Sequence, residues 1–333
     1  MPKTTTFAST TLDPDSFKDI YPPKIVNELL TRIVGGHLVI TAIIGLCLNI
    51  FMFFHFLNSE KLSFYILCTS KTFSNALSLL VYLCYLGPIH LFYTSIGSEY
   101  FSTRLQQIFG FALFSQGPLT EMLITVNRFL VIMFTPTTIP KYSTHVTVVA
   151  LAATWLGGVW WSTLPGYPDY CMIPFSIDHV GYYESDCNQQ NVMILVFMII
   201  GLAVFNNSMN IVLAIKLGIS AKKLKGVSSE AAKNRRKQTV RFFTQSCIQD
   251  WLTAAVALNN ILAISFYCKR HSCAILTTFA TDSMSYATDG LLMFIFNYKR
   301  IKKPSVSDNF KRMDTVEDVS STKVFTARNS IAN

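Results

Sequence analysis

Long runs of apolar residues separated by short polar segments dominate the chain from residue 33 to residue 296. A helix needs about 20 apolar residues to cross roughly 30 Å of hydrocarbon, because unpaired backbone groups are too costly there. Six runs satisfy this requirement. They predict membrane-spanning helices over residues 33–57, 62–86, 105–134, 146–164, 192–219 and 239–267.

A seventh run, residues 274–296, is less apolar because it contains Thr, Ser and Asp, and taken alone it could be a loop. If it did not cross, the basic block at 299–303 would lie opposite the basic segment between the fifth and sixth runs, whereas Lys and Arg collect on the cytoplasmic side. We therefore predict an all-α membrane protein with a bundle of seven transmembrane helices.

The distribution of Lys and Arg predicts the orientation of the bundle. Nine of them lie between Lys216 and Arg241, whereas the segment from Pro165 to Gln190 has none and contains four acidic residues. By the positive-inside rule the N-terminus is outside. We expect an extracellular tail over 1–32, a seven-helix domain over 33–298 and a disordered cytoplasmic tail over 299–333. Because residues 1–32 are polar, the first span should be an uncleaved anchor.

Composition agrees with this topology and excludes several function classes. Apolar residues make up 51% of the chain and charged residues 14%, against about 25% charged in soluble domains. The net charge of +9 comes from short blocks between spans, so it indicates topology rather than nucleic-acid binding. The six His residues have no metal-ligand spacing, and we find no catalytic constellation. We expect no enzyme activity, metal or cofactor.

Four ionisable residues fall inside the spans at similar depth: Lys71, Glu121, Asp250 and Asp289. A charge at the bilayer centre costs at least about 2.5 kcal/mol, so such residues usually face the bundle interior and have a partner. We expect one polar layer in which Lys71 pairs with Glu121 or Asp289. Protonation of some of them, or contact with water near a helix end, is the alternative. In the sixth span an inward-facing arc holds the amides Gln245, Gln249, Asn259 and Asn260.

The cysteine positions indicate a disulfide outside the membrane. Cys171 and Cys187 lie in the long segment between the fourth and fifth spans, and a bridge closing about 15 residues could contribute roughly 3 kcal/mol. Cys268 and Cys273 could pair with each other or with the first two.

At the inner end of the third span, ITVNRFLVIMFTP places Asn127, Arg128 and Phe129 at the membrane edge and Pro136 in the following loop. The segment resembles the Asp-Arg-Tyr motif of rhodopsin-like receptors. We expect the Arg128 head to reach water, and a snorkelling anchor is the simpler alternative for it.

The closer resemblance is to the nematode chemoreceptors called serpentine receptor class X. It covers roughly residues 35–303 and is carried by GLCLNIFMFF with Asn49, CTSKTFSN with Lys71 and Asn75, the NRF at Asn127, RFFTQSCIQDW and DGLLMFIFN. We add Asn49 and Asn75 to the expected polar layer. The wider rhodopsin-like pattern is incomplete, because the second span has no Asp, the sixth no Cys-Trp-x-Pro and the seventh no Asn-Pro-x-x-Tyr. The sodium site of that pattern is therefore not carried over.

The resemblance implies a rhodopsin-like G-protein-coupled receptor for a small-molecule or pheromone-like cue. It also implies a heterotrimeric G protein as partner, and the plasma membrane, with the cilium of a sensory neuron, as location. The residues expected to contact the G protein are Asn127, Arg128, Phe129, Pro136, Arg235, Arg236 and Lys237. Topology control alone could also explain the basic run. A seven-span transporter or channel-like protein is the alternative function.

The topology can be tested with a tag at residue 5 and another at residue 330. We expect labelling of the first tag on intact cells, and of the second only after permeabilisation, because an odd number of spans separates the tails. Equal labelling of both tags on intact cells would contradict seven spans.

Overall fold

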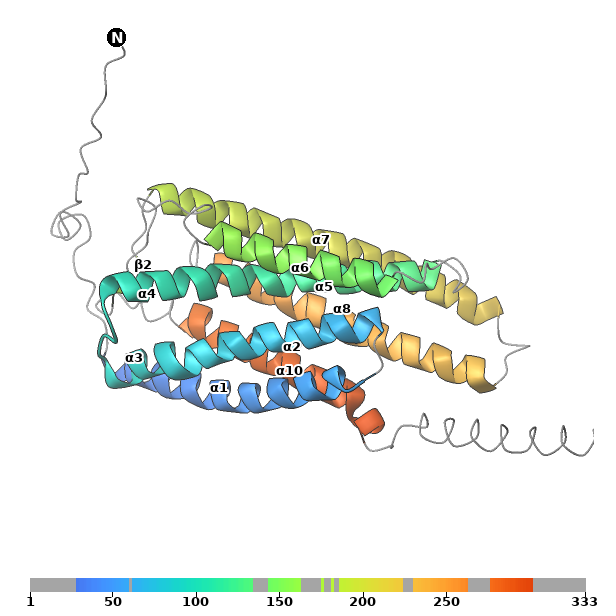
Figure 1. Cartoon of the computed structure of the whole chain (residues 1–333), viewed down its shortest axis with the longest axis horizontal. Coiled ribbons are helices and arrows are strands. Elements are labelled where there is room, and N and C mark those ends of the chain that lie inside the picture. Colours follow the sequence, from blue (N-terminus) through green and yellow to red (C-terminus); the bar gives the residue numbers. More distant parts are fainter. Residues whose placement is uncertain are drawn as a thin grey trace, which may run out of the picture.

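The computed structural model describes residues 28–59, 62–133, 143–162, 175–176, 181–182, 186–223, 230–262 and 276–301. Within these residues, seven helical rods run side by side along the long axis of the molecule (Figure 1). The first three rods are α1 (Glu28–Leu57); α2 (Ser63–Val81) with a π-helical turn (Tyr82–Leu86) and α3 (Gly87–Phe92); and α4 (Glu99–Gln106) with a π-helical turn (Gln107–Ala112) and α5 (Leu113–Met133).

The remaining four rods are α6 (Ser143–Ser162), α7 (Asp186–Lys223), α8 (Glu230–Leu262), and a π-helical turn (Leu276–Ala280) continued by α10 (Thr281–Ile301). Two short antiparallel strands, β1 (Phe175–Ser176) and β2 (Gly181–Tyr182), pair Phe175 with Tyr182. The expected N-terminal tail before residue 28 and the expected C-terminal tail after residue 301 lie outside the described residues.

Several helix ends differ from the predicted ones. The first helix begins at Glu28 rather than at residue 33, and α8 begins at Glu230 rather than at 239. The added turns of α8 contain AAKNRRKQ, whose Ala, Lys, Arg and Gln residues have high helix propensity in water. The prediction missed them because it measured only apolar length. It also missed β1 and β2, which are too short to show a strand pattern.

The bundle has apolar side chains on its outside and polar ones in its centre. Ile40, Leu156 and Phe197 are 62%, 71% and 64% exposed, whereas Asn49 and Ser283 are fully buried. In water this distribution would be unstable, because the apolar surface would be solvated and the polar groups would not. It suits a bundle surrounded by lipid tails.

By length and composition, three helices within the described residues are long and apolar enough to cross a bilayer: Glu28–Leu57, Ser63–Phe92 and Met193–Ile219. The apolar helix Thr144–Trp160 is shorter. This is fewer than the six strongly apolar spans that we expected. The rods formed by α4–α5, α8 and α10 contribute many of the buried polar residues, which lowers their mean hydropathy even though they stand in the same bundle.

Two apolar clusters hold α1 against its neighbours at two levels. One contains Val34, Leu38 and Ala42 of α1 with Leu79 of α2, and the other contains Met52 and Phe56 of α1, Tyr65 and Cys68 of α2 and Met293 of α10. Along α1, Asn49 lies between the clusters, and Lys71 and Asn75 lie between them along α2. The clusters therefore enclose a polar layer at mid-bundle from both ends.

The contact of α1 with α3 depends on a glycine. A Cβ built on Gly35 would lie 2.3 Å from the backbone nitrogen of Leu91 and 2.6 Å from its Cα, so the two helices could not keep this distance. The next residue, Gly36, offers a matched control, because its Cβ would meet only the Leu91 side chain at 3.9 Å.

We predict that Gly35→Ala lowers the free energy of unfolding by about 1–3 kcal/mol, as overpacking usually does. Gly36→Ala should be neutral or slightly stabilising, because Ala has the higher helix propensity. Thermal unfolding of both purified variants in one detergent tests this. Equal melting temperatures for the two variants would mean that the α1–α3 distance is not constrained at Gly35.

Candidate functional site

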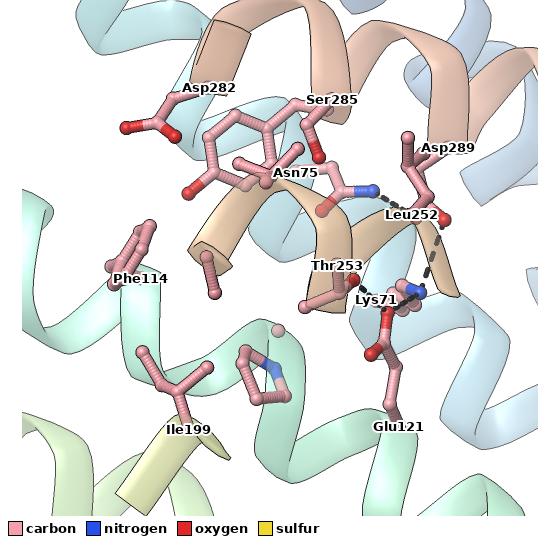
Figure 2. Close-up of a pocket in the computed structure, with 15 residues that line it drawn as sticks. Lys71, Asn75, Phe114, Glu121, Ile199, Leu252, Thr253, Asp282, Ser285 and Asp289 are labelled. Atoms are coloured by element: carbon pink, nitrogen blue, oxygen red, sulfur yellow. Dashed lines mark hydrogen bonds and ion pairs between the residues drawn. The ribbon is translucent and has the colours of Figure 1, made fainter. Parts of the chain in front are cut away.

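A buried lysine bound to two carboxylates lies at the centre of the bundle. Lys71 of α2 places its Nζ 2.5 Å from Glu121 Oε1 of α5 and 3.1 Å from Asp289 Oδ1 of α10. All three side chains are less than 10% exposed. Both acids that the sequence offered as partners therefore contact Lys71, and Figure 2 shows the two carboxylates converging on its ammonium group.

Neutral donors add further hydrogen bonds to the two carboxylates. Asn75 donates to Asp289 Oδ2 and Gln249 to Asp289 Oδ1, both at 2.6 Å, and Thr253 donates to Glu121 Oε1 at 2.9 Å. Hydrogen bonds to buried charges offset part of the desolvation cost, so each donor favours the ionised form of its partner. Gln245 donates in turn to Gln249 Oε1 at 3.3 Å.

Asn49 connects this network to α1. Its amide nitrogen donates to the backbone oxygens of Gly45 and Tyr286, at 2.8 and 3.1 Å, and its oxygen accepts from Asn75 at 3.4 Å. The Asn49 side chain fits against α10 because residue 290 is glycine, whose missing Cβ would lie 2.6 Å from Asn49 Nδ2. We call the connected set the Lys71 network: Asn49, Lys71, Asn75, Glu121, Gln245, Gln249, Thr253 and Asp289.

We expected Asp250 to belong to the polar layer around Lys71, but its hydrogen bonds lead to α7 instead. Its carboxylate accepts from Asn210 of α7 at 2.6 Å and from Asn206 at 3.4 Å, so it joins α8 to α7. Neighbouring helix residues point about 100° apart, and Gln249 already faces Asp289. Sequence analysis missed Asn206, Asn210 and Thr253, although the i, i+4 spacing of the two asparagines on one face of an apolar span was a usable signal.

Arg128 is buried, and the expectation that its head reaches water is wrong. The residue is 6% exposed, and its guanidinium carbon lies 5.1 Å from the centre of the Phe64 ring. That ring packs on Phe242 of α8 at 4.6 Å, so an aromatic pair covers the head. Among the described residues, Arg128 Nε and Nη1 have no hydrogen-bond partner. Burying a charge in this way is costly.

The other predicted contact residues are not gathered with Arg128 into a described surface. Asn127 and Phe129 are half-buried, and Lys237 is exposed. Pro136 and the side chains of Arg235 and Arg236 lie outside the described part of the chain, as do the side chains of Cys171 and Cys187 and the whole of Cys268 and Cys273. The predicted disulfide remains a prediction.

A pocket with an empty volume of about 540 Å³ opens beside the Lys71 network. The helices α2, α5, α8 and α10 each contribute residues three or four positions apart, so each presents one face to the pocket. The lining is Lys71, Asn75, Phe114, Gly117, Pro118, Glu121, Ile199, Leu252, Thr253, Val256, Ala257, Asp282, Ser285, Tyr286 and Asp289. Pockets for small molecules typically combine an apolar wall with a few polar groups, and this lining has that character.

The fold and the enclosed polar layer define a seven-helix membrane bundle of the rhodopsin type. The crystal structure of squid rhodopsin matches it with a TM-score of 0.67 and 17% sequence identity, over 88% of this chain and 90% of that chain. At this identity the likeness shows the fold alone. No curated protein sequence matches the chain significantly.

The particular family follows from the sequence. Residues 39–297 match the family model described as "Serpentine type 7TM GPCR chemoreceptor Srx", and the chain belongs to this family. It is thus a multi-pass membrane protein of a G-protein-coupled chemoreceptor family, and a receptor rather than an enzyme. The resemblance drawn from the short motifs, and the seven-helix fold, are confirmed.

The Lys71 network generates a stability prediction. Lys71→Met leaves two buried carboxylates without their cation, which should cost about 3–5 kcal/mol in free energy of unfolding. Lys71→Met with Glu121→Gln and Asp289→Asn removes all three charges and should recover most of that loss. Melting temperatures in the same detergent test the pair of variants. If the single variant is as stable as wild type, the ion pairs do not hold the helices together.

Proposed function

We propose that the chain is a chemosensory receptor of the plasma membrane, with its N-terminus outside, that binds an external chemical cue and activates a heterotrimeric G protein. The observation that carries this proposal is that one set of residues serves both the pocket and the interhelical contacts. Five members of the Lys71 network also line the pocket: Lys71, Asn75, Glu121, Thr253 and Asp289.

A ligand in this pocket would touch the groups that hold α2, α5, α8 and α10 in their present arrangement. It shifts the balance between two helix arrangements only if its affinity for them differs. Contact with an ion pair supplies such a difference, because a small displacement of one partner changes a strong interaction. No chemical conversion of the ligand is needed.

Arg128 supplies the second part of the proposal. Its buried head is covered by Phe64, and Phe64 packs on Phe242 of α8. Outward displacement of α8 would uncover the guanidinium, which would gain hydration that the present arrangement denies it. We propose that the uncovered Arg128, with Arg235, Arg236 and Lys237 at the start of α8, contacts the G protein. Family resemblance further supports the cilium of a sensory neuron as the location.

Arg128→Met tests this step. Because the wild-type head is buried without a described hydrogen-bond partner, removing its charge should leave surface expression equal or higher. The receptor would be expressed with a promiscuous G protein and screened for an activating cue. At equal surface level, we expect Arg128→Met to reduce cue-evoked G-protein activation at least ~10-fold, the equivalent of about 1.4 kcal/mol.

Arg32→Met is the matched control, because Arg32 is a half-exposed arginine on α1 that pairs only with the exposed Glu28 among the described residues. It should signal like wild type. If Arg128→Met activates the G protein as well as wild type does at equal surface level, Arg128 has no role in coupling and serves only in packing.

A further inference from the structure

We call the part of the pocket lined by Lys71, Asn75, Glu121 and Asp289 its floor. This floor carries an excess of negative charge. Lys71 is the one basic residue among the residues described as lining it, and it faces the two carboxylates of Glu121 and Asp289. One ammonium against two carboxylates leaves one negative charge. A third carboxylate, Asp282, lies on the same lining, two helical turns from Asp289 on α10.

The floor also presents hydrogen-bond acceptors that lack donors. Lys71 and Thr253 both bind Oε1 of Glu121, and no described residue donates to Oε2. Likewise, Asn75 uses its amide nitrogen for Asp289 and Asn49, and no described residue donates to its oxygen. Glu121 is 4% exposed and Asn75 2% exposed. Figure 2 shows the free Glu121 oxygen directed away from Lys71 and the Asn75 oxygen away from Asp289.

Two acceptors that open to the pocket beside an excess negative charge favour a ligand that is cationic and donates hydrogen bonds. The lining also has an apolar part, formed by Phe114, Ile199, Leu252 and Val256 among others. We infer that the pocket binds a ligand with a protonated amine on a small apolar body, with the ammonium at Glu121 Oε2 and Asn75 Oδ1 and the body against these apolar side chains. The inference rests on the proposed function and names the chemical class of the cue.

The opposite assignment, an anionic cue bound by Lys71, is disfavoured by the same geometry. The Lys71 ammonium already binds two carboxylates, so an added anion would have to displace one of them or increase the repulsion. An ammonium, in contrast, binds the open Oε2 of Glu121 while Lys71 keeps Oε1. The two cations then share one carboxylate and repel each other, which weakens the contact between α2 and α5 and links occupation of the pocket to the helix arrangement.

The test uses the purified full-length protein in detergent at pH 7, without a G protein. Three probes of similar shape differ in charge: 2-phenylethylamine is cationic, 2-phenylethanol neutral and 3-phenylpropionate anionic. We expect the amine to raise the melting temperature by ~3 °C or more in a concentration-dependent way, because it binds only the folded state. The alcohol, the carboxylate and sodium chloride at equal ionic strength should not.

Glu121→Gln keeps the size of the side chain and removes its charge, so the amine-induced rise should vanish. Glu28→Gln removes an exposed carboxylate that does not line the pocket, and it should keep the full rise. If Glu121→Gln does not fold, the melting temperatures of the wild-type protein with the three probes still test the inference. An equal or larger shift with the alcohol or the carboxylate overturns the inference, and so does no shift with either the amine or its shorter analogue benzylamine.

The binding measurement is independent of signalling. Amine binding without G-protein activation in cells would contradict the proposed function and leave the inference intact. If a cue activates the G protein but no amine changes the melting temperature, the proposed function stands and the inference is contradicted.

Discussion

The Lys71 ammonium between Glu121 and Asp289 is the interaction on which the arrangement of the bundle depends. Lipid tails are as apolar as most helix surfaces, so apolar burial alone does not select which faces of the helices meet. A buried charge without a partner is far more costly than any one apolar contact. Because the three charges come from α2, α5 and α10, these helices must meet at one depth and with one rotation.

Once these three charges are paired, the positions of the neutral polar residues follow. The amides of Asn75 and Gln249 fill the remaining acceptor sites of Asp289, and Asn49 extends the network to α1 over Gly290. Apolar clusters on both sides of this layer contribute packing energy. Buried ion pairs add little net stability compared with apolar contacts, but breaking one is costly. The network therefore fixes how α2, α5 and α10 meet more than it adds to the free energy of unfolding.

The helix α8 connects the separate parts of the interior. Gln249 and Thr253 bind the carboxylates beside Lys71, and the adjacent Asp250 binds α7. Two turns before Gln249 on the same helix, Phe242 helps to cover Arg128. Any displacement of α8 therefore changes all three contacts together. This is the physical basis for linking the pocket to the Arg128 end of the bundle.

The sequence by itself determined the class of fold, because helix length and the cost of buried charge are local properties that can be read from apolar runs and from the few ionisable residues within them. It also narrowed the partners of Lys71 to two acids at similar depth. It placed Asp250 in the same layer but did not identify Asn206 and Asn210 as its partners, because helix rotation decides which side chains an acid at a given depth reaches. The tertiary structure alone revealed the burial of Arg128, since Phe64 and Phe242, distant in the chain, close over it only when α2 and α8 pack together.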